Sequence, residues 1–160
     1  MPATCFFRLN GKRMSTLQCL DFGSMLAFSG NGRYVNDPGA TAIPRNGPLP
    51  HGTYYIVDRQ SGGRHGAAVD AISDRANGTR KRDWFAPYST TSPISDYLMI
   101  RGVRRGNFRI HPVGYWRVSE GCITLPNQHN FYAFRDWLNR QATAKVPGTE
   151  LDYYGTVTVI

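Results

Sequence analysis

The sequence predicts a mainly β fold, a β-sandwich or open barrel, with one amphipathic helix in its C-terminal half. Most apolar stretches are short, rich in β-branched and aromatic residues, and separated by turn residues, including many of the 17 glycines and 10 prolines. Only one stretch repeats its apolar residues at a helical spacing. We expect the 160 residues to form a single domain.

Four strands are predicted before residue 60, at residues 6–9, 15–19, 25–28 and 53–57. Asn10-Gly11 stands between the first two and is a dipeptide favoured in two-residue hairpin turns, so these two strands are expected to pair. Turn residues dominate from position 33 to position 50, which indicates a long surface loop.

The second half is less regular. Residues 61–95 are interpreted as an insertion near the active-site cleft, with a helix over 67–76, or else as an excursion from the sheet edge. Residues 97–101 and 107–111 are predicted to form a hairpin, and residues 155–160 the last strand. The helix is predicted over 130–140, where Phe131, Phe134, Trp137 and Leu138 recur at steps of three and four and form one apolar face.

The segment from Arg109 to Ile123 contains the strongest candidate for a nucleophile, Cys122, and a histidine that could activate it, His111. The thiolate is the attacking form of cysteine, and a neighbouring imidazole lowers the thiol pKa. Ser119-Glu-Gly-Cys122 is typical of a tight turn in which Gly121 lets the backbone approach a reacting carbonyl. The amides of such a turn can stabilise an oxyanion.

Ile110-His111 followed by Ser119-Glu-Gly-Cys-Ile123 resembles the signature of L,D-transpeptidases. The resemblance implies that His111 is the base and Cys122 the nucleophile, and it places Ser119 and Gly121 on the serine and glycine of the motif. Glu120 stands where the family usually has a second histidine, and Thr124 where it usually has arginine. These departures concern the acceptor and the recognition of substrate carboxylates.

Further motifs are spread over most of the chain: Phe28-Ser-Gly-Asn-Gly32, Asn36-Asp-Pro38, Gly47-Pro-Leu-Pro-His-Gly-Thr-Tyr-Tyr-Ile-Val-Asp-Arg59, Gly62-Gly63, Ile110-His-Pro112 and Tyr154-Gly-Thr-Val-Thr158. Together they resemble a divergent L,D-transpeptidase-like branch. This branch (Tlde1-like) contains peptidoglycan-targeting effectors delivered between bacteria by type VI secretion. The resemblance implies a β-sandwich or open barrel in which the histidine strand and the cysteine turn lie side by side at one end.

The implied reaction is acyl transfer through a Cys122 thioester at the L,D bond of a tetrapeptide stem, with hydrolysis or exchange of the terminal D-alanine. Candidate substrate-binding residues are Arg109, Tyr115, Trp116 and Glu120. One alternative is a papain-like or NlpC-type cysteine peptidase, in which the cysteine precedes the histidine. The other is a non-catalytic basic module that binds cell wall or nucleic acid, since the formal charge is +8. No specific nucleic-acid-binding motif is found.

We expect no cofactor and no metal, because no zinc-type ligand spacing occurs. Cys5 and Cys19 are interpreted as two buried thiols, with a disulfide between them as the alternative. Neither a transmembrane segment nor a secretory signal peptide is predicted. We therefore expect delivery by type VI secretion from the producer's cytoplasm into the periplasm of a target cell. The expected partners are peptidoglycan stem peptides, a secretion-apparatus component and a cognate periplasmic immunity protein.

Overall fold

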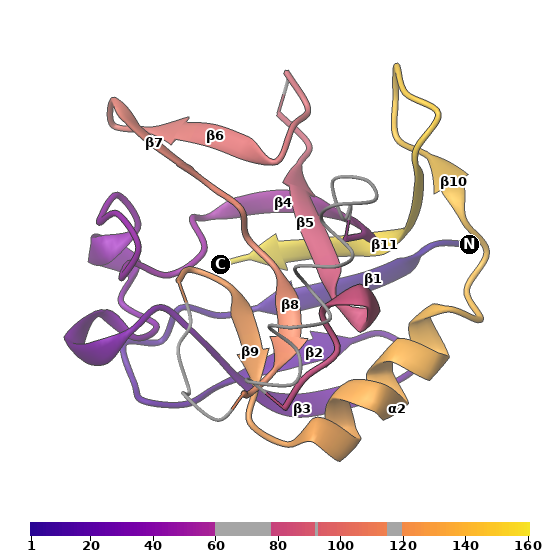
Figure 1. The fold of residues 1–160 in the computed structure, drawn as a ribbon, viewed down its shortest axis with the longest axis horizontal. Coiled ribbons are helices and arrows are strands. Elements are labelled where there is room, and N and C mark those ends of the chain that lie inside the picture. Colours follow the sequence, from indigo (N-terminus) through magenta and orange to yellow (C-terminus); the bar gives the residue numbers. More distant parts are fainter. Residues whose placement is uncertain (60–77, 92, 115–119) are drawn as a thin grey trace.

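The computed structural model describes residues 1–59, 78–91, 93–114 and 120–160, and in these residues one curved sheet forms most of the molecule (Figure 1). The strand order is β1-β2-β3-β9-β8-β5-β4-β11-β10. Parallel pairing of β1 with β11 closes the first eight strands of that order into a barrel, and β10 extends from β11. The strands are β1 Ala3–Phe7, β2 Ser15–Cys19, β3 Gly23–Ser29, β4 Gly52–Asp58, β5 Phe85–Ser89, β8 Ile110–Pro112, β9 Ile123–Leu125, β10 Ala144–Lys145 and β11 Asp152–Val159.

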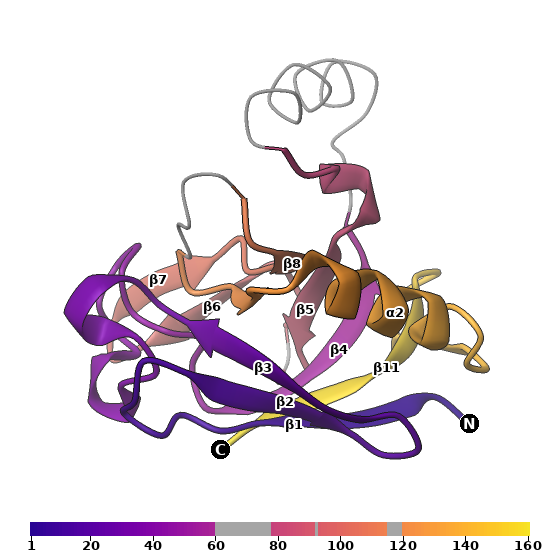
Figure 2. The ribbon, with the colours of Figure 1, turned by 90° about the horizontal axis from the view of Figure 1, so that it is seen from below.

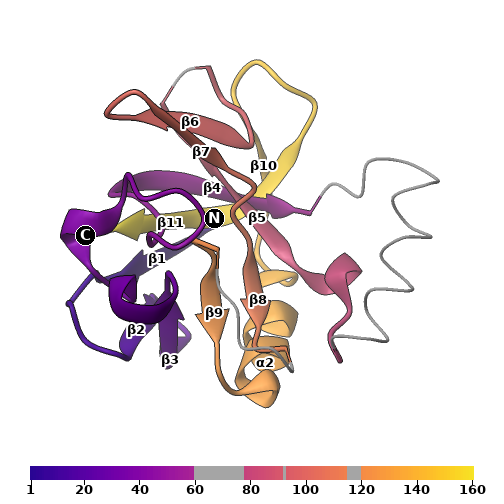
Figure 3. The same cartoon turned by 60° about the vertical axis from the view of Figure 1, so that its left-hand side comes forward.

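The remaining described elements surround this barrel. A separate hairpin of β6 (Tyr97–Ile100) and β7 (Val103–Gly106) projects from one end, as Figure 3 shows. Three short 3-10 helices span Gly32–Tyr34, Pro38–Ala40 and Lys81–Asp83. The helix α2 (Gln128–Leu138) lies beside β8 and β9 (Figure 2). No helix among the described residues is long and apolar enough to cross a membrane. The predicted mainly β fold with one helix in the C-terminal half is thus confirmed.

The helix begins two residues before the predicted boundary, because the side chain of Asn127 caps it by accepting the backbone N–H of Asn130. Its apolar face is the predicted one. Phe131, Phe134 and Leu138 are fully buried in the barrel core, and Trp137 packs half-buried against Phe22 with ring centroids 4.9 Å apart.

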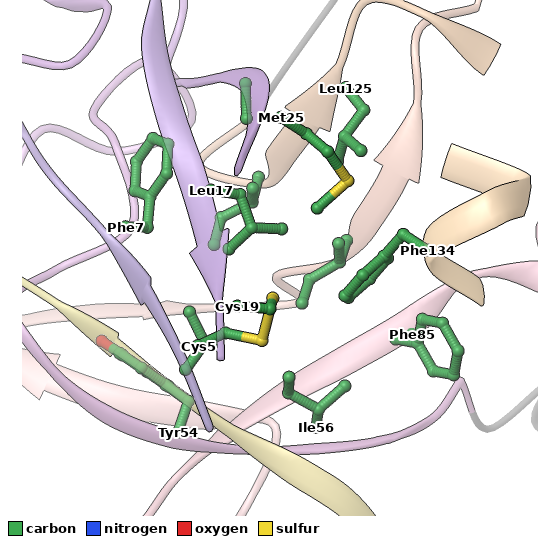
Figure 4. Close-up of a cluster of buried hydrophobic side chains, with 14 of the residues drawn as sticks. Cys5, Phe7, Leu17, Cys19, Met25, Tyr54, Ile56, Phe85, Leu125 and Phe134 are labelled. Atoms are coloured by element: carbon green, nitrogen blue, oxygen red, sulfur yellow. A yellow bond between two sulfur atoms is a disulfide. The ribbon is translucent and has the colours of Figure 1, made fainter. Parts of the chain in front are cut away.

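Cys5 and Cys19 form a disulfide in the middle of this core (Figure 4). The two residues are directly opposite each other in the antiparallel pair of β1 and β2, and both are almost completely buried. The interpretation of two free thiols is therefore wrong. The pairing could not be inferred from the spacing of the cysteines, because it depends on the register of the hairpin.

Removing the disulfide should destabilise the barrel. A bridge that closes a loop of this length, with a separation of 14 residues, contributes about 3 kcal/mol. We expect the Cys5→Ala/Cys19→Ala protein to unfold roughly 6–12 °C lower in a thermal melt. The wild-type protein melted with a reducing agent is the control and should approach the variant. Equal melting temperatures for oxidised and reduced wild type would contradict the prediction.

The connection between β1 and β2 is longer than predicted. Both strands form, but residues 8–14 link them in place of a two-residue turn at Asn10-Gly11. The side chain of Asn10 accepts the backbone N–H of Lys12 and donates to the carbonyl of Met14, so it stabilises a wider turn.

The hairpin near residue 100 also differs from the prediction, because β6 pairs with β7 and not with residues 107–111. Arg101 and Gly102 have φ angles of 48° and 76°, the left-handed pair that a type I′ turn requires. Arg-Gly is not the usual signature of that turn, and the two-residue connection was therefore missed. Residues 110–112 are free to join the barrel as β8.

A further correction concerns residues 61–95, interpreted as an insertion. Phe85–Ser89 within them is β5, which pairs with both β4 and β8 in the barrel wall. Pro87 opposite Ile56 explains the error, since proline argues against a central strand. The helix predicted over 67–76 lies outside the described residues.

Candidate active site

The parallel pairing of β8 with β9 places the predicted base on one strand and the predicted nucleophile at the start of its neighbour. Ile110 is opposite Ile123 and His111 opposite Thr124, and the two strands lie side by side in Figure 1 and Figure 3. The backbone N–H of Ile123 donates to the carbonyl of Arg109 at 2.9 Å, and Cys122 directly precedes β9.

Alternation along the strands separates the core side chains from those of the site. Ile110 and Ile123 are completely buried in the barrel core. The alternating residues of the ladder, His111 on one strand and Cys122 and Thr124 on the other, therefore occupy the opposite face. His111 and Cys122 are diagonal neighbours, a relation that separates residues by about 7–8 Å in sheets and is within reach of a long or aromatic side chain.

His111 is held as a neutral imidazole. Its Nδ1 lies 2.7 Å from the carbonyl oxygen of Pro112, which can only accept, so Nδ1 carries the proton and Nε2 is an acceptor. The Thr124 hydroxyl donates to Nε2 at 3.4 Å. Trp84 stacks on the ring with centroids 4.4 Å apart. Burial lowers the pKa of His111 from 6.5 to about 4, although the hydrogen bond to Pro112 raises it. At neutral pH this imidazole is therefore uncharged, with Nε2 unprotonated.

Cys122 is held as a thiol. It is 7% exposed, and burial raises its pKa from 9.0 to about 11. A hydrogen bond from the Arg109 backbone and the charge of the Arg109 guanidinium lower the pKa, whereas the carboxylates of Glu120 and Asp96 raise it. The sequence suggested a thiol whose pKa His111 lowers. The structure instead has a neutral thiol and a neutral imidazole, so proton transfer must accompany attack.

The alkylation of Cys122 by iodoacetamide tests this protonation state. Only the thiolate reacts, and the raised pKa means that its fraction grows about tenfold per pH unit up to pH 11. We expect little reaction at pH 7 and a midpoint well above pH 9. The same protein in denaturant should show an ordinary thiol midpoint. A midpoint below pH 8 in the folded protein would instead indicate a thiolate–imidazolium pair.

The turn before Cys122 is fixed by its surroundings. Gly121 has a φ of 85°, and a Cβ at this position would lie 2.5 Å from Nη2 of Arg105 and 2.8 Å from the Phe108 ring. The buried hydroxyl of Ser29 donates to the Gly121 carbonyl at 3.3 Å and accepts from the backbone N–H of Leu49. Glycine is required here for both conformation and space.

Arg109, a predicted substrate-binding residue, is buried and its guanidinium is occupied. It forms a two-pronged ion pair with Asp96 at 2.7 and 2.8 Å and also donates to Asn107 and to the carbonyl of Phe108. Asp96 immediately precedes β6. This contact therefore joins the base of the β6–β7 hairpin to the strand that carries His111.

Arg105 was not singled out by the sequence, yet its side chain holds the loop over residues 41–48 in place. It is 4% exposed, and its guanidinium donates to the carbonyls of Thr41, Gly47 and Pro48 at 2.6–2.9 Å. Its neighbour Arg104 is exposed, so the two arginines look alike in sequence and differ in role. Sequence reasoning also missed Trp84 and Ser29, because both are far from Cys122 along the chain and only the fold brings them to the site.

A pocket of about 310 Å³ lies against the turn before Cys122. Glu120, another predicted substrate-binding residue, is exposed and lines it. The other lining residues are Pro44, Arg45, Tyr97, Arg104, Arg105 and Gly106. The predicted site residues Ser119, Tyr115 and Trp116 lie outside the described residues.

Comparison with family models matches the Tlde1 domain to residues 23–149, which is most of the chain. The matched range includes both strands of the candidate site and the turn that carries Cys122. Comparison with curated proteins and with solved structures found no match.

Proposed function

We propose, since the chain belongs to the Tlde1 domain family of L,D-transpeptidase-like type VI effectors, that it is an antibacterial cysteine enzyme that modifies peptidoglycan. It cleaves the L,D bond of tetrapeptide stems and exchanges the terminal D-alanine for other D-amino acids. The observation that supports this most strongly is the parallel register that sets His111 and Cys122 on one face of adjacent strands.

The proposed first step forms a thioester. Nε2 of His111 takes the proton of the Cys122 thiol as the sulfur attacks the carbonyl carbon of the L,D bond. The C–N bond then breaks, and the imidazolium gives its proton to the departing D-alanine amine. Backbone amides around Gly121 and Cys122 stabilise the oxyanion, each contributing about 3 kcal/mol. Because the resting pair is a neutral thiol and a neutral imidazole, the proton moves as the sulfur attacks and not before.

The second step resolves the thioester. Water attacks the acyl carbon while His111 accepts its proton, the C–S bond breaks, and the thiol is regenerated with a tripeptide product. A D-amino acid amine attacks in the same way and leaves an exchanged tetrapeptide. Both outcomes remove the donor stems that cross-linking needs.

The proposed place of action is the periplasm of a target cell, reached by type VI secretion. The buried Cys5–Cys19 disulfide supports this, because disulfides persist in oxidising compartments such as the periplasm. Besides stem peptides, the proposed partners are a secretion-apparatus component and a periplasmic immunity protein that covers the turn around Cys122.

Expression in two compartments tests the proposal. We expect the chain to be tolerated in the cytoplasm and to cause swelling or lysis when fused to a periplasmic export signal. Mass spectrometry of digested sacculi should then show tetrapeptides converted to tripeptides, with exchanged stems when a D-amino acid is supplied. The Cys122→Ala fusion is the control and should be harmless. Toxicity confined to cytoplasmic expression would contradict a wall target.

A further inference from the structure

The pocket against the Glu120–Gly121 turn is lined by charged side chains of both signs that form no ion pair with one another among the described residues. Arg45, Arg104 and Arg105 line it together with Glu120, and within the described parts of the chain none of these arginines pairs with a carboxylate. At about 310 Å³ the pocket lies at the small end of ligand sites. Its position is close to the nucleophile, because Glu120 is two residues before Cys122 and a Cβ on Gly121, the residue between them, would lie 2.5 Å from Nη2 of Arg105.

Arg105 has donors left over for a ligand. A guanidinium has five N–H donors, and both on Nη1 and one on Nη2 are used by the three loop carbonyls. The Nε–H and the second Nη2–H have no acceptor among the described residues. An arginine that keeps its positive charge and two donors at a pocket wall is suited to bind an anion, because a guanidinium and an anion form charge-assisted hydrogen bonds.

The two exposed arginines are held over the same pocket. Arg45 has a φ of 63°, an unusual left-handed conformation for a residue with a side chain, on the loop that Arg105 holds by its carbonyls. Arg104 stacks its guanidinium on the ring of Tyr97 at 4.1 Å. The backbone of Arg45 and the side chain of Arg104 are therefore constrained before any ligand arrives.

Glu120 determines which anion fits. The three arginines attract any small anion, but only a ligand that also carries a positive charge can pair with Glu120. An α-amino acid has both, an ammonium group next to its carboxylate. We infer that this pocket, here called the acceptor pocket, binds a free α-amino acid, with the carboxylate on the three arginines and the ammonium on Glu120.

The acceptor pocket deepens the proposed function and rests on it for its role in turnover. The leaving D-alanine and an incoming amino acid pass through the same transition-state geometry in opposite directions, so one pocket serves both. In the exchange step the C–S bond of the thioester breaks and a C–N bond forms. Of the two protons that the ammonium loses, one ends on the Cys122 sulfur by way of His111 and the other is released to water.

Binding is measured first, on the Cys122→Ala protein, by NMR titration with D-alanine and with D-alaninamide. We expect D-alaninamide to bind at least about tenfold more weakly, because it lacks the carboxylate. Adding Arg45→Ala/Arg104→Ala should weaken D-alanine binding at least about tenfold and abolish that preference. The matched control is Arg8→Ala/Arg140→Ala, which removes the same charge at two exposed positions and should bind as the parent does.

Turnover is measured second, on proteins that keep Cys122. Glu120→Gln should lower the ratio of exchange to hydrolysis at least about tenfold at a fixed D-amino acid concentration. Equal binding of D-alanine and D-alaninamide, no binding of either, or an unchanged ratio in Glu120→Gln would overturn the inference. If D-alanine binds as expected but wild type releases no D-alanine from tetrapeptides, the proposed reaction fails and the amino-acid site stands.

Discussion

Replacing Cys122 with alanine is expected to abolish the release of D-alanine from purified disaccharide-tetrapeptides. No other described side chain on this face of β8 and β9 can form the thioester, so the rate should fall at least about 10⁴-fold. The substitution removes one buried sulfur and should leave the fold unchanged, which circular dichroism checks. Full activity in the variant would end the thioester mechanism.

His111→Ala provides the companion measurement. Loss of the base should lower the rate at least about 10²-fold. In the Cys122→Ala background the same change should have no further effect, because nucleophile and base act as one unit. An additive second loss would show that His111 acts somewhere other than on Cys122.

The second large effect is expected on stability, from Arg105→Met. Methionine keeps much of the buried side-chain volume but removes the donors to three loop carbonyls, each of which then costs about 1–3 kcal/mol if left unsatisfied. We expect a loss of at least about 3 kcal/mol in the free energy of unfolding in urea. This corresponds to a melting temperature roughly 10 °C lower.

Arg104→Met is the matched control, since it changes the adjacent residue from the same amino acid and Arg104 is exposed. It should alter the free energy of unfolding by no more than about 0.5 kcal/mol. Similar losses for the two variants would mean that the loop carbonyls are satisfied without Arg105.

The fold class could be predicted because periodicity and turn residues are local. The strands at 15–19 and 53–57 and the apolar face of α2 follow from their own sequences. The errors arose where a residue has an untypical role, as Pro87 does in a central strand and Arg101 in a left-handed turn. Closure of the barrel depends on which distant strands pair, and no local pattern determines this.

Only the site residues that belong to a recognisable sequence motif could be predicted. Cys122 and His111 are 11 positions apart, and their resemblance to a known signature identified both. Protonation states could not be read in this way, because they depend on burial under Trp84 and on charges from Arg109 and Asp96. Arg45 and Arg105 come from different segments that meet only in the folded protein.

The pairing of β1 with β11 has a consequence for how the chain folds. Ala3 is opposite Gly155, and a side chain on Gly155 would lie 2.6 Å from the carbonyl oxygen of Ala3, so the closing seam is tight and joins residues about as distant as the chain allows. Contacts between such distant residues form slowly, because a long loop must close first. Until the seam forms, β1 and β11 each present an unpaired edge to other chains. Aggregation during refolding is therefore expected to be most pronounced in the interval before these two strands meet.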